Sequence, residues 1–306
     1  FMKSAIRTGL IVVLALAGAP LSGDVSDVPP DGFSLSPESR RVLETGLGST
    51  DDGQFSYIAG RVSSAELIAA FYDRDRAVAR VAVDAAGYSD EPWDLVPWLA
   101  AFIGAGERPV ASAAAAALLR ALNQAADLRE NPSFPVQRQA DHGLRMLNEV
   151  VGRTSVAPDL RVAALWARRR MIEWIERPTA LPVELWRDPH PLIRDTVLGL
   201  LDVPLSEAEL RKVAEAVSDD DPGVRGHAAS LLCENALSHG VERLSADLSE
   251  VIRSLLEPGA DPRQVAPLLP CLSRFPYESR ADISDLVLKQ THPGTVRLWK
   301  SLTETD

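Results

Sequence analysis

The sequence predicts an all-α protein, an α/α superhelix of about six or seven helix pairs in which each pair packs on its neighbours. Three observations predict this class. Short apolar stripes recur at helical spacing, turn residues precede them, and the strict alternation typical of strands is scarce. Hydrophobic residues make up 46% of the chain but aromatic residues only 6%, which favours closely packed, alanine-rich helices over a sheet with a bulky core.

The clearest helix pair lies between residues 206 and 232. Ser206 and Glu209 form a capping-box pattern that begins one helix. Asp221 and Pro222 suit the N-cap and the first position of the next helix. On that second helix, apolar side chains recur at i, i+4, i+7 and i+8: Val224, Ala228, Leu231 and Leu232. This segment is therefore predicted to be a helix, a tight turn and a second helix.

Similar stripes occur along most of the chain. Their first apolar residues are Val78, Val110, Leu160, Ile193 and Val224, and weaker copies lie near residues 261–272 and 291–302. Most steps are about 30 residues, which suits two short helices. The step from Val110 to Leu160 is longer. We interpret residues 124–157 as an insertion that contains an extended loop at residues 131–135 and an extra helix.

Three segments carry a resemblance to a known family. "DPGVRGHAASLL", "PDLRVAALWA" and "HPLIRDTVLGLL" are similar to the turn and second helix of HEAT repeats, which build armadillo-like α-solenoids. The resemblance covers roughly residues 60–300, and it implies polar contacts between the turns of neighbouring repeats. The residues that would form these turns and this ladder are Asp75, Asp221, Arg161, Arg194, Arg225 and Arg297. Ala79 and Ala111 replace the arginine in the first two units, so a continuous ladder is not expected.

The domain organisation follows from composition. Lys3 and Arg7 precede an apolar run at residues 10–17 and then small residues, the pattern of a secretory signal. We expect a signal peptide at 1–23, a flexible leader and capping helix at 24–60, the HEAT-like array at 61–302 and a tail at 303–306. The apolar run is too short to span a bilayer. The expected location is therefore periplasmic or secreted, with membrane contact only through an uncleaved N-terminus.

The charge of the chain argues against nucleic acid as a partner. The formal net charge is −11, whereas nucleic-acid-binding domains usually carry a basic stripe. The densest basic cluster, Arg168 to Arg170, lies within a predicted helix. We interpret it as a solvated helix face.

No residue pattern predicts catalysis, a metal or a cofactor. The sequence holds no zincin motif, nucleophile elbow, phosphate-binding glycine loop or dinucleotide fingerprint. Asp219 to Asp221 are followed by Pro and Gly rather than by alternating oxygen ligands, so helix capping explains them better than calcium. Cys233 and Cys271 lie on second helices of adjacent units. Packed helices are about 8–10 Å apart, too far for a disulfide, so we expect free, buried thiols.

The aromatic residues are expected mainly in the core. Trp93, Trp98, Trp166 and Trp174 fall near predicted apolar stripes. Trp299 lies in the last and least regular unit, which has only one neighbour to cover it, so it is the tryptophan expected to be exposed. Residues 53–62 are the only short run that we expect to be extended.

The function implied by the resemblance is a non-catalytic scaffold. HEAT repeat proteins generally bind protein partners, here outside the cytoplasm and through the face lined by the second helices. We expect a monomer whose partner no residue identifies. Two alternatives stay open: an enzyme or enzyme accessory of the lyase-like repeat type, and a structural subunit of an envelope assembly.

Overall fold

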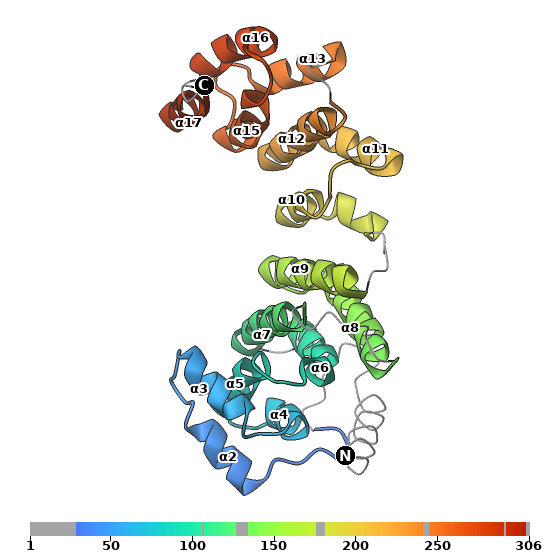
Figure 1. Cartoon of the computed structure of the whole chain (residues 1–306), viewed down its shortest axis with the longest axis vertical. Coiled ribbons are helices and arrows are strands. Elements are labelled where there is room, and N and C mark those ends of the chain that lie inside the picture. Colours follow the sequence, from blue (N-terminus) through green and yellow to red (C-terminus); the bar gives the residue numbers. More distant parts are fainter. Residues whose placement is uncertain are drawn as a thin grey trace. The chain divides into compact units, whose positions relative to one another are not determined.

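The computed structural model describes residues 29–105, 107–126, 134–175, 181–240, 245–290 and 292–303. Every regular element in these ranges is a helix, so the predicted all-α class is confirmed (Figure 1). The expected signal peptide, residues 1–23, lies outside the described residues. Among the helices that are described, none has the length and apolar character that a membrane span needs. The chain divides into two compact units, residues 1–180 and 181–306.

The described part of the first unit begins at residue 29 and is coloured blue to green in Figure 1. Its helices are α2 (Pro37–Glu44), α3 (Asp52–Ala59), α4 (Ser64–Phe71), α5 (Arg76–Ala86), α6 (Pro92–Ala105), α7 (Arg108–Ala126), α8 (Phe134–Gly152) and α9 (Pro158–Ile175). Residues 53–62 were predicted to be extended, and this prediction was wrong because α3 covers most of them. The side chain of Asp51 caps that helix by accepting a hydrogen bond from the Gly53 N–H at 2.9 Å.

The helices of the first unit form two layers. Helices α4, α6 and α8 contact one another in chain order, and so do α5, α7 and α9. Each helix of one layer also packs on the next helix in sequence, giving the pairs α4–α5, α6–α7 and α8–α9. The segment interpreted as an insertion contributes α8, which packs against both α6 and α9. Residues 127–133, which hold most of the predicted loop, lie outside the described part of the chain.

The core of the first unit is built from alanine and a group of aromatic rings. Trp98 is 1% exposed, and its ring lies 5.7 Å from that of Phe33 and 6.4 Å from that of Tyr72. Burial raises the pKa of the Tyr72 hydroxyl. Trp93 is also buried, as expected, but Trp166 is 43% exposed. The prediction for Trp166 was wrong because this side chain lies on the outward side of α9; the side chain of Trp174 is outside the described residues.

The second unit is coloured yellow-green to red in Figure 1. Its elements are the 3₁₀ helix η1 (Val183–Arg187), α10 (Pro191–Gly199), α11 (Glu207–Ala216), α12 (Pro222–Ser238), α13 (Ala246–Leu255), α14 (Pro262–Val265), the 3₁₀ helix η2 (Ala266–Leu268), α15 (Leu269–Ser273), α16 (Tyr277–Leu288) and α17 (Pro293–Thr303). Helix α12 lies centrally, since it contacts α10, α11, α13, α14, η2 and α15. The predicted helix, turn and helix at residues 206–232 correspond to α11 and α12.

Cys233 and Cys271 form a disulfide, so the prediction of two free thiols was wrong. Their Cα atoms are 6.3 Å apart, inside the range that a disulfide allows. The prediction assumed ordinary helix spacing, but α12 approaches α14 more closely at Gly226. A Cβ added there would lie 2.2 Å from the Gln264 carbonyl oxygen. Only glycine permits this approach, which brings the following segment within reach of Cys233.

Trp299 is 2% exposed, which corrects the prediction that it faces solvent. It belongs to a core cluster that also contains Phe275, Leu272 and Val287. Helix α17 packs on α15 and α16, so the last helix buries the indole against the preceding ones. The last helix, α17, thus covers apolar side chains of the helices before it.

Candidate binding surface

Arg194 joins two successive turns of the second unit. Its Nε and Nη2 donate to the two carboxylate oxygens of Asp219 at 2.7 and 2.6 Å, and its Nη1 donates to the Asp188 carbonyl at 2.7 Å. Partial burial raises the pKa of Asp219, but the hydrogen bonds from Arg194 and from the Asp221 N–H outweigh it and hold that pKa below its ordinary value. This bidentate pair fixes α10 against the turn before α12.

Arg225 repeats the arrangement one helix pair later. Its Nη1 donates to the Asp219 carbonyl, six residues back, at 2.7 Å, as Arg194 does to Asp188. Its Nε donates at 2.8 Å to the side-chain oxygen of Gln264 in α14, an amide in place of the carboxylate that Arg194 contacts. Side chains in a first helical turn lean toward the N-terminus, so an arginine at this position reaches the carbonyls of its own turn.

An arginine near a helix start that pairs with an aspartate of a later turn also occurs in α2, in a segment where no repeat was predicted. Pro37 and Arg40 have the spacing of Pro191 and Arg194, and Arg40 pairs with Asp73 in the turn before α5. A search for proline followed three residues later by arginine would have found this position. It was missed because the apolar stripe after Pro37 is short and lies in the segment taken as a leader.

The remaining predicted turn and ladder residues have different roles. Asp75 and Asp221 are N-caps of α5 and α12, accepting hydrogen bonds from the N–H groups of the first turn. Arg161 is buried and donates to the Val151 carbonyl at 2.8 Å. Arg297 is exposed on α17, and within the described chain no hydrogen bond joins it to another residue. The six residues therefore lie at the N-caps or in the N-terminal half of their helices, but only some of them make contacts with a neighbouring helix pair.

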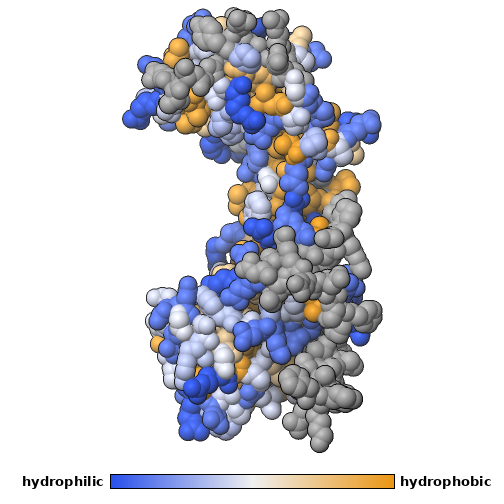
Figure 2. Space-filling model, viewed as in Figure 1, coloured by the Kyte–Doolittle hydropathy of each residue, from blue (hydrophilic) through white to orange (hydrophobic). Residues whose placement is uncertain are grey.

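An open groove of about 700 Å³ lies in the second unit along the N-terminal halves of α10, α12 and the α14–η2 segment. We call it the second-layer groove. It is lined by His190, Pro191, Leu192, Asp195, Asp221, Gly223, His227, Ser230, Arg263, Ala266 and Pro267. Leu192 is 43% exposed, a large fraction for a leucine inside a concave surface. Figure 2 shows hydrophobic surface around η1 and α10, within a mostly hydrophilic exterior.

The groove brings together His227 and Asp195, which sequence reasoning did not connect. The His227 Nδ1 lies 2.9 Å from Asp195 Oδ1. Ser230 follows one turn later on α12, but its hydroxyl donates to the Pro267 carbonyl at 2.8 Å. No hydrogen bond joins Ser230 to His227 among the described residues. The three side chains therefore lack the serine-to-histidine contact of a catalytic triad.

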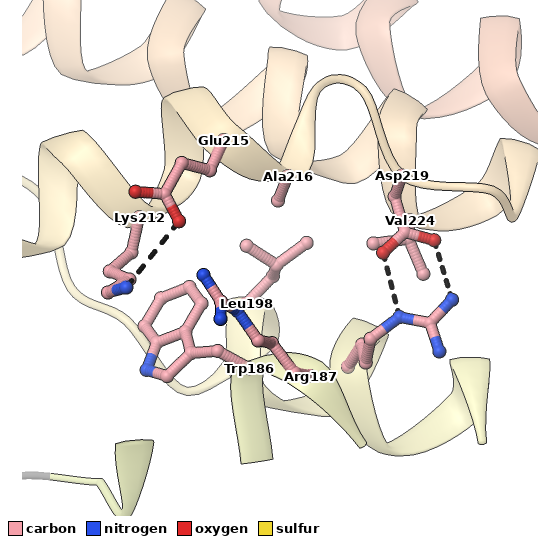
Figure 3. A pocket seen from close by; sticks show the side chains of 9 residues that line it. Trp186, Arg187, Leu198, Lys212, Glu215, Ala216, Asp219 and Val224 are labelled. Atoms are coloured by element: carbon pink, nitrogen blue, oxygen red, sulfur yellow. Dashed lines mark hydrogen bonds and ion pairs between the residues drawn. The ribbon is translucent and has the colours of Figure 1, made fainter. Parts of the chain in front are cut away.

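A smaller pocket of about 170 Å³ lies between η1 and the α10–α12 segment. Figure 3 shows the lining side chains: Leu198 lies near the centre of the view with Ala216 above it, Val224 lies beside Asp219, and Trp186 lies below Lys212. Lys212 pairs with Glu215 at 3.5 Å. The Arg194–Asp219 pair closes one end of the pocket.

Comparison with known proteins adds no relative. No protein-family model, curated protein or solved structure matches the chain significantly. Within the described residues, no three or more His, Cys, Asp or Glu side chains cluster as a metal site would require.

Proposed function

We propose that this chain is a non-catalytic, exported HEAT-like scaffold that binds an extended segment of a protein partner in the second-layer groove. The observation that carries the proposal is the groove itself, whose lining includes the exposed Leu192 and the apolar residues Ala266 and Pro267. Apolar surface lining a concavity is typical of ligand and partner sites.

Two features support the repeat architecture. The layers of the first unit contact in chain order, as stacked helix pairs do. The proline-to-arginine spacing recurs at Pro37, Pro158, Pro191 and Pro222, and two of these arginines pair with an aspartate in the following turn. Each of these contacts joins one helix to the turn before a later helix of the same unit.

The proposed location outside the cytoplasm has two supports. The N-terminal sequence matches a secretory signal, and the disulfide between Cys233 and Cys271 is consistent with an oxidising compartment. Both cysteines of this disulfide are buried, which suits a structural cross-link.

The chemistry of the groove favours binding over catalysis. Asp221 is engaged as a helix cap, Ser230 donates to a carbonyl, and Arg263 pairs with Asp221 and Asp261 at 3.3 and 3.2 Å. The His227 ring, with Nδ1 facing Asp195, leaves Nε2 to meet a peptide group of the partner. An extended segment of the partner places an apolar side chain over Leu192 and a peptide group at the His227 Nε2.

Selection of displayed peptides against residues 29–306 would test the proposal. We expect selected peptides to bind the wild-type chain and to lose at least about tenfold in affinity to Leu192→Glu, because a buried charge opposes the apolar contact. Leu288→Glu is the matched control, since Leu288 is 46% exposed on α16, away from the groove residues. Peptides that bind both variants equally would contradict the proposed site.

A second experiment tests whether the groove binds a partner in the cell envelope. Cross-linking in the envelope fraction should yield one protein adduct with the wild type and with Leu288→Glu, and lose it with Leu192→Glu. An adduct that survives Leu192→Glu would show that a different surface binds the partner.

A further inference from the structure

The pocket between η1 and the α10–α12 segment holds one cation that no residue in the described part of the chain neutralises. Three basic side chains line it, together with two acidic ones. Arg194 is neutralised by its bidentate contact with Asp219, and Lys212 by Glu215. Arg187 forms no hydrogen bond or ion pair with any other described residue. The pocket therefore carries a net positive charge in a chain whose formal net charge is −11.

The position of Arg187 suits it to meet a ligand. It follows Trp186 on η1, and Figure 3 shows its guanidinium extending into the space between Trp186 and Leu198. A guanidinium presents its N–H donors in a planar fork that matches a carboxylate. Lys212 lies on the facing helix, close enough to the pocket to supply a further N–H donor.

The walls and the size of the pocket limit the rest of the ligand. Leu198, Ala216 and Val224 form an apolar surface, and the indole of Trp186 adds a flat wall. The volume of about 170 Å³ equals that of about six water molecules in the liquid. This space accommodates a branched aliphatic group and a carboxylate, but no nucleotide or sugar chain.

We propose that this pocket binds a monocarboxylate with a small aliphatic body, its carboxylate on Arg187 and its aliphatic part against Trp186 and Leu198. Such a group occurs both in a free acyl amino acid and at the C-terminus of a polypeptide. The inference stands apart from the second-layer groove, because the residues that line the two sites are different.

Titration calorimetry with N-acetyl-leucine and with N-acetyl-leucinamide tests the proposal on the wild-type chain. We expect saturable binding of the acid with a dissociation constant near 1 mM or below, and binding of the amide at least about tenfold weaker. Equal binding of acid and amide, or no binding of the acid at about 20 mM, would overturn the carboxylate assignment.

Arg187→Gln supplies the residue-level test. This variant should bind the acid at least about tenfold more weakly, since it loses the charged fork. Arg274→Gln, which removes an exposed arginine at the end of α15, should leave the affinity within about twofold. Arg187 is itself exposed and unpaired within the described chain, so the variant should unfold at the wild-type temperature. Unchanged binding by Arg187→Gln would reject its role.

A third arm distinguishes the two sources of the carboxylate. A tetrapeptide that ends in leucine with a free carboxylate is compared with the same peptide amidated. Tighter binding of the free peptide than of N-acetyl-leucine would identify a polypeptide C-terminus, and equal binding would identify a free small acid. Preference for the amidated peptide would contradict both.

Discussion

The two units of this chain stabilise helical packing by different means. The first unit uses long helices, such as α7 and α8 with 19 residues each, and buries Trp98, Phe71 and Phe102 among alanines. The second unit uses shorter elements, such as α10 with 9 residues and α15 with 5. It adds a disulfide between α12 and α15, and Arg194 and Arg225 join its successive turns, as Arg40 does in the first unit.

The difference follows from the area that each helix can bury. A short helix removes less apolar surface from water, so it contributes less to stability. A cross-link limits the freedom of the unfolded chain, and a satisfied polar contact fixes the register of neighbouring turns. We therefore expect the first unit to be most sensitive to core truncation, and the second to the loss of its cross-link and its close approaches.

The largest effect is expected in the aromatic core of the first unit. Trp98→Ala should reduce the free energy of unfolding by about 3–5 kcal/mol, because it leaves a cavity among Phe33, Tyr72 and the neighbouring alanines. Trp166→Ala is the matched control, since that ring is 43% exposed, and it should change stability by about 0.5 kcal/mol or less. Chemical denaturation measures both. Equal losses would contradict the placement of Trp98 in the core.

Removing the disulfide should have the next largest effect. Replacing Cys233 and Cys271 by alanine should destabilise the second unit by about 2–4 kcal/mol. Hydrogen exchange should then accelerate in α12 and α15 while amides in α6 and α7 keep their protection. Uniform acceleration in both units would show that they unfold together and would remove the contrast between them.

Gly226 tests the close approach that makes the disulfide possible. Gly226→Ala should cost about 3 kcal/mol, because the new methyl group would meet backbone atoms of Gln264 that cannot move aside easily. Gly199→Ala is the control in the same unit, since its Cβ would lie 3.4 Å from a His227 ring atom, an ordinary contact. We expect that variant to be neutral in thermal unfolding, and a similar loss in both would contradict the argument.

The smallest effect is expected at the Arg194–Asp219 contact. Asp219→Asn should reduce stability by about 1.5 kcal/mol at pH 7. The folded-state pKa of Asp219 lies below its ordinary value of 3.8. The ionised Asp219 carboxylate therefore contributes its full stability at a pH above 3.8. It is lost as the pH falls through the folded pKa. The stabilities of the wild type and the variant, measured in denaturation curves, should converge once the pH lies below the folded-state pKa of Asp219. A difference that persists in acid would show that the charge is not responsible.

The candidate sites were only partly predictable. Asp75 and Asp221 were found because a cap and its helix are adjacent in sequence, and the arginines were found because each follows an apolar residue near the start of a predicted stripe. His227 and Asp195 were not connected, because they are 32 residues apart and meet only when α10 packs on α12. No sequence pattern predicts a role for Arg187, because it is a candidate ligand-binding residue only through its lack of a partner among the described residues around it.

The sequence alone determined most of the helices, although not α3, and many of their caps, because those features depend on hydrogen bonds and apolar periodicity over a few residues. Only the tertiary structure decided which distant residues meet. Cys233 reaches Cys271 because Gly226 lets two backbones approach, and Trp299 is buried because the last helix folds back on α15. Such distances depend on how side chains interlock between helices, and the spacing of residues along one helix does not specify them.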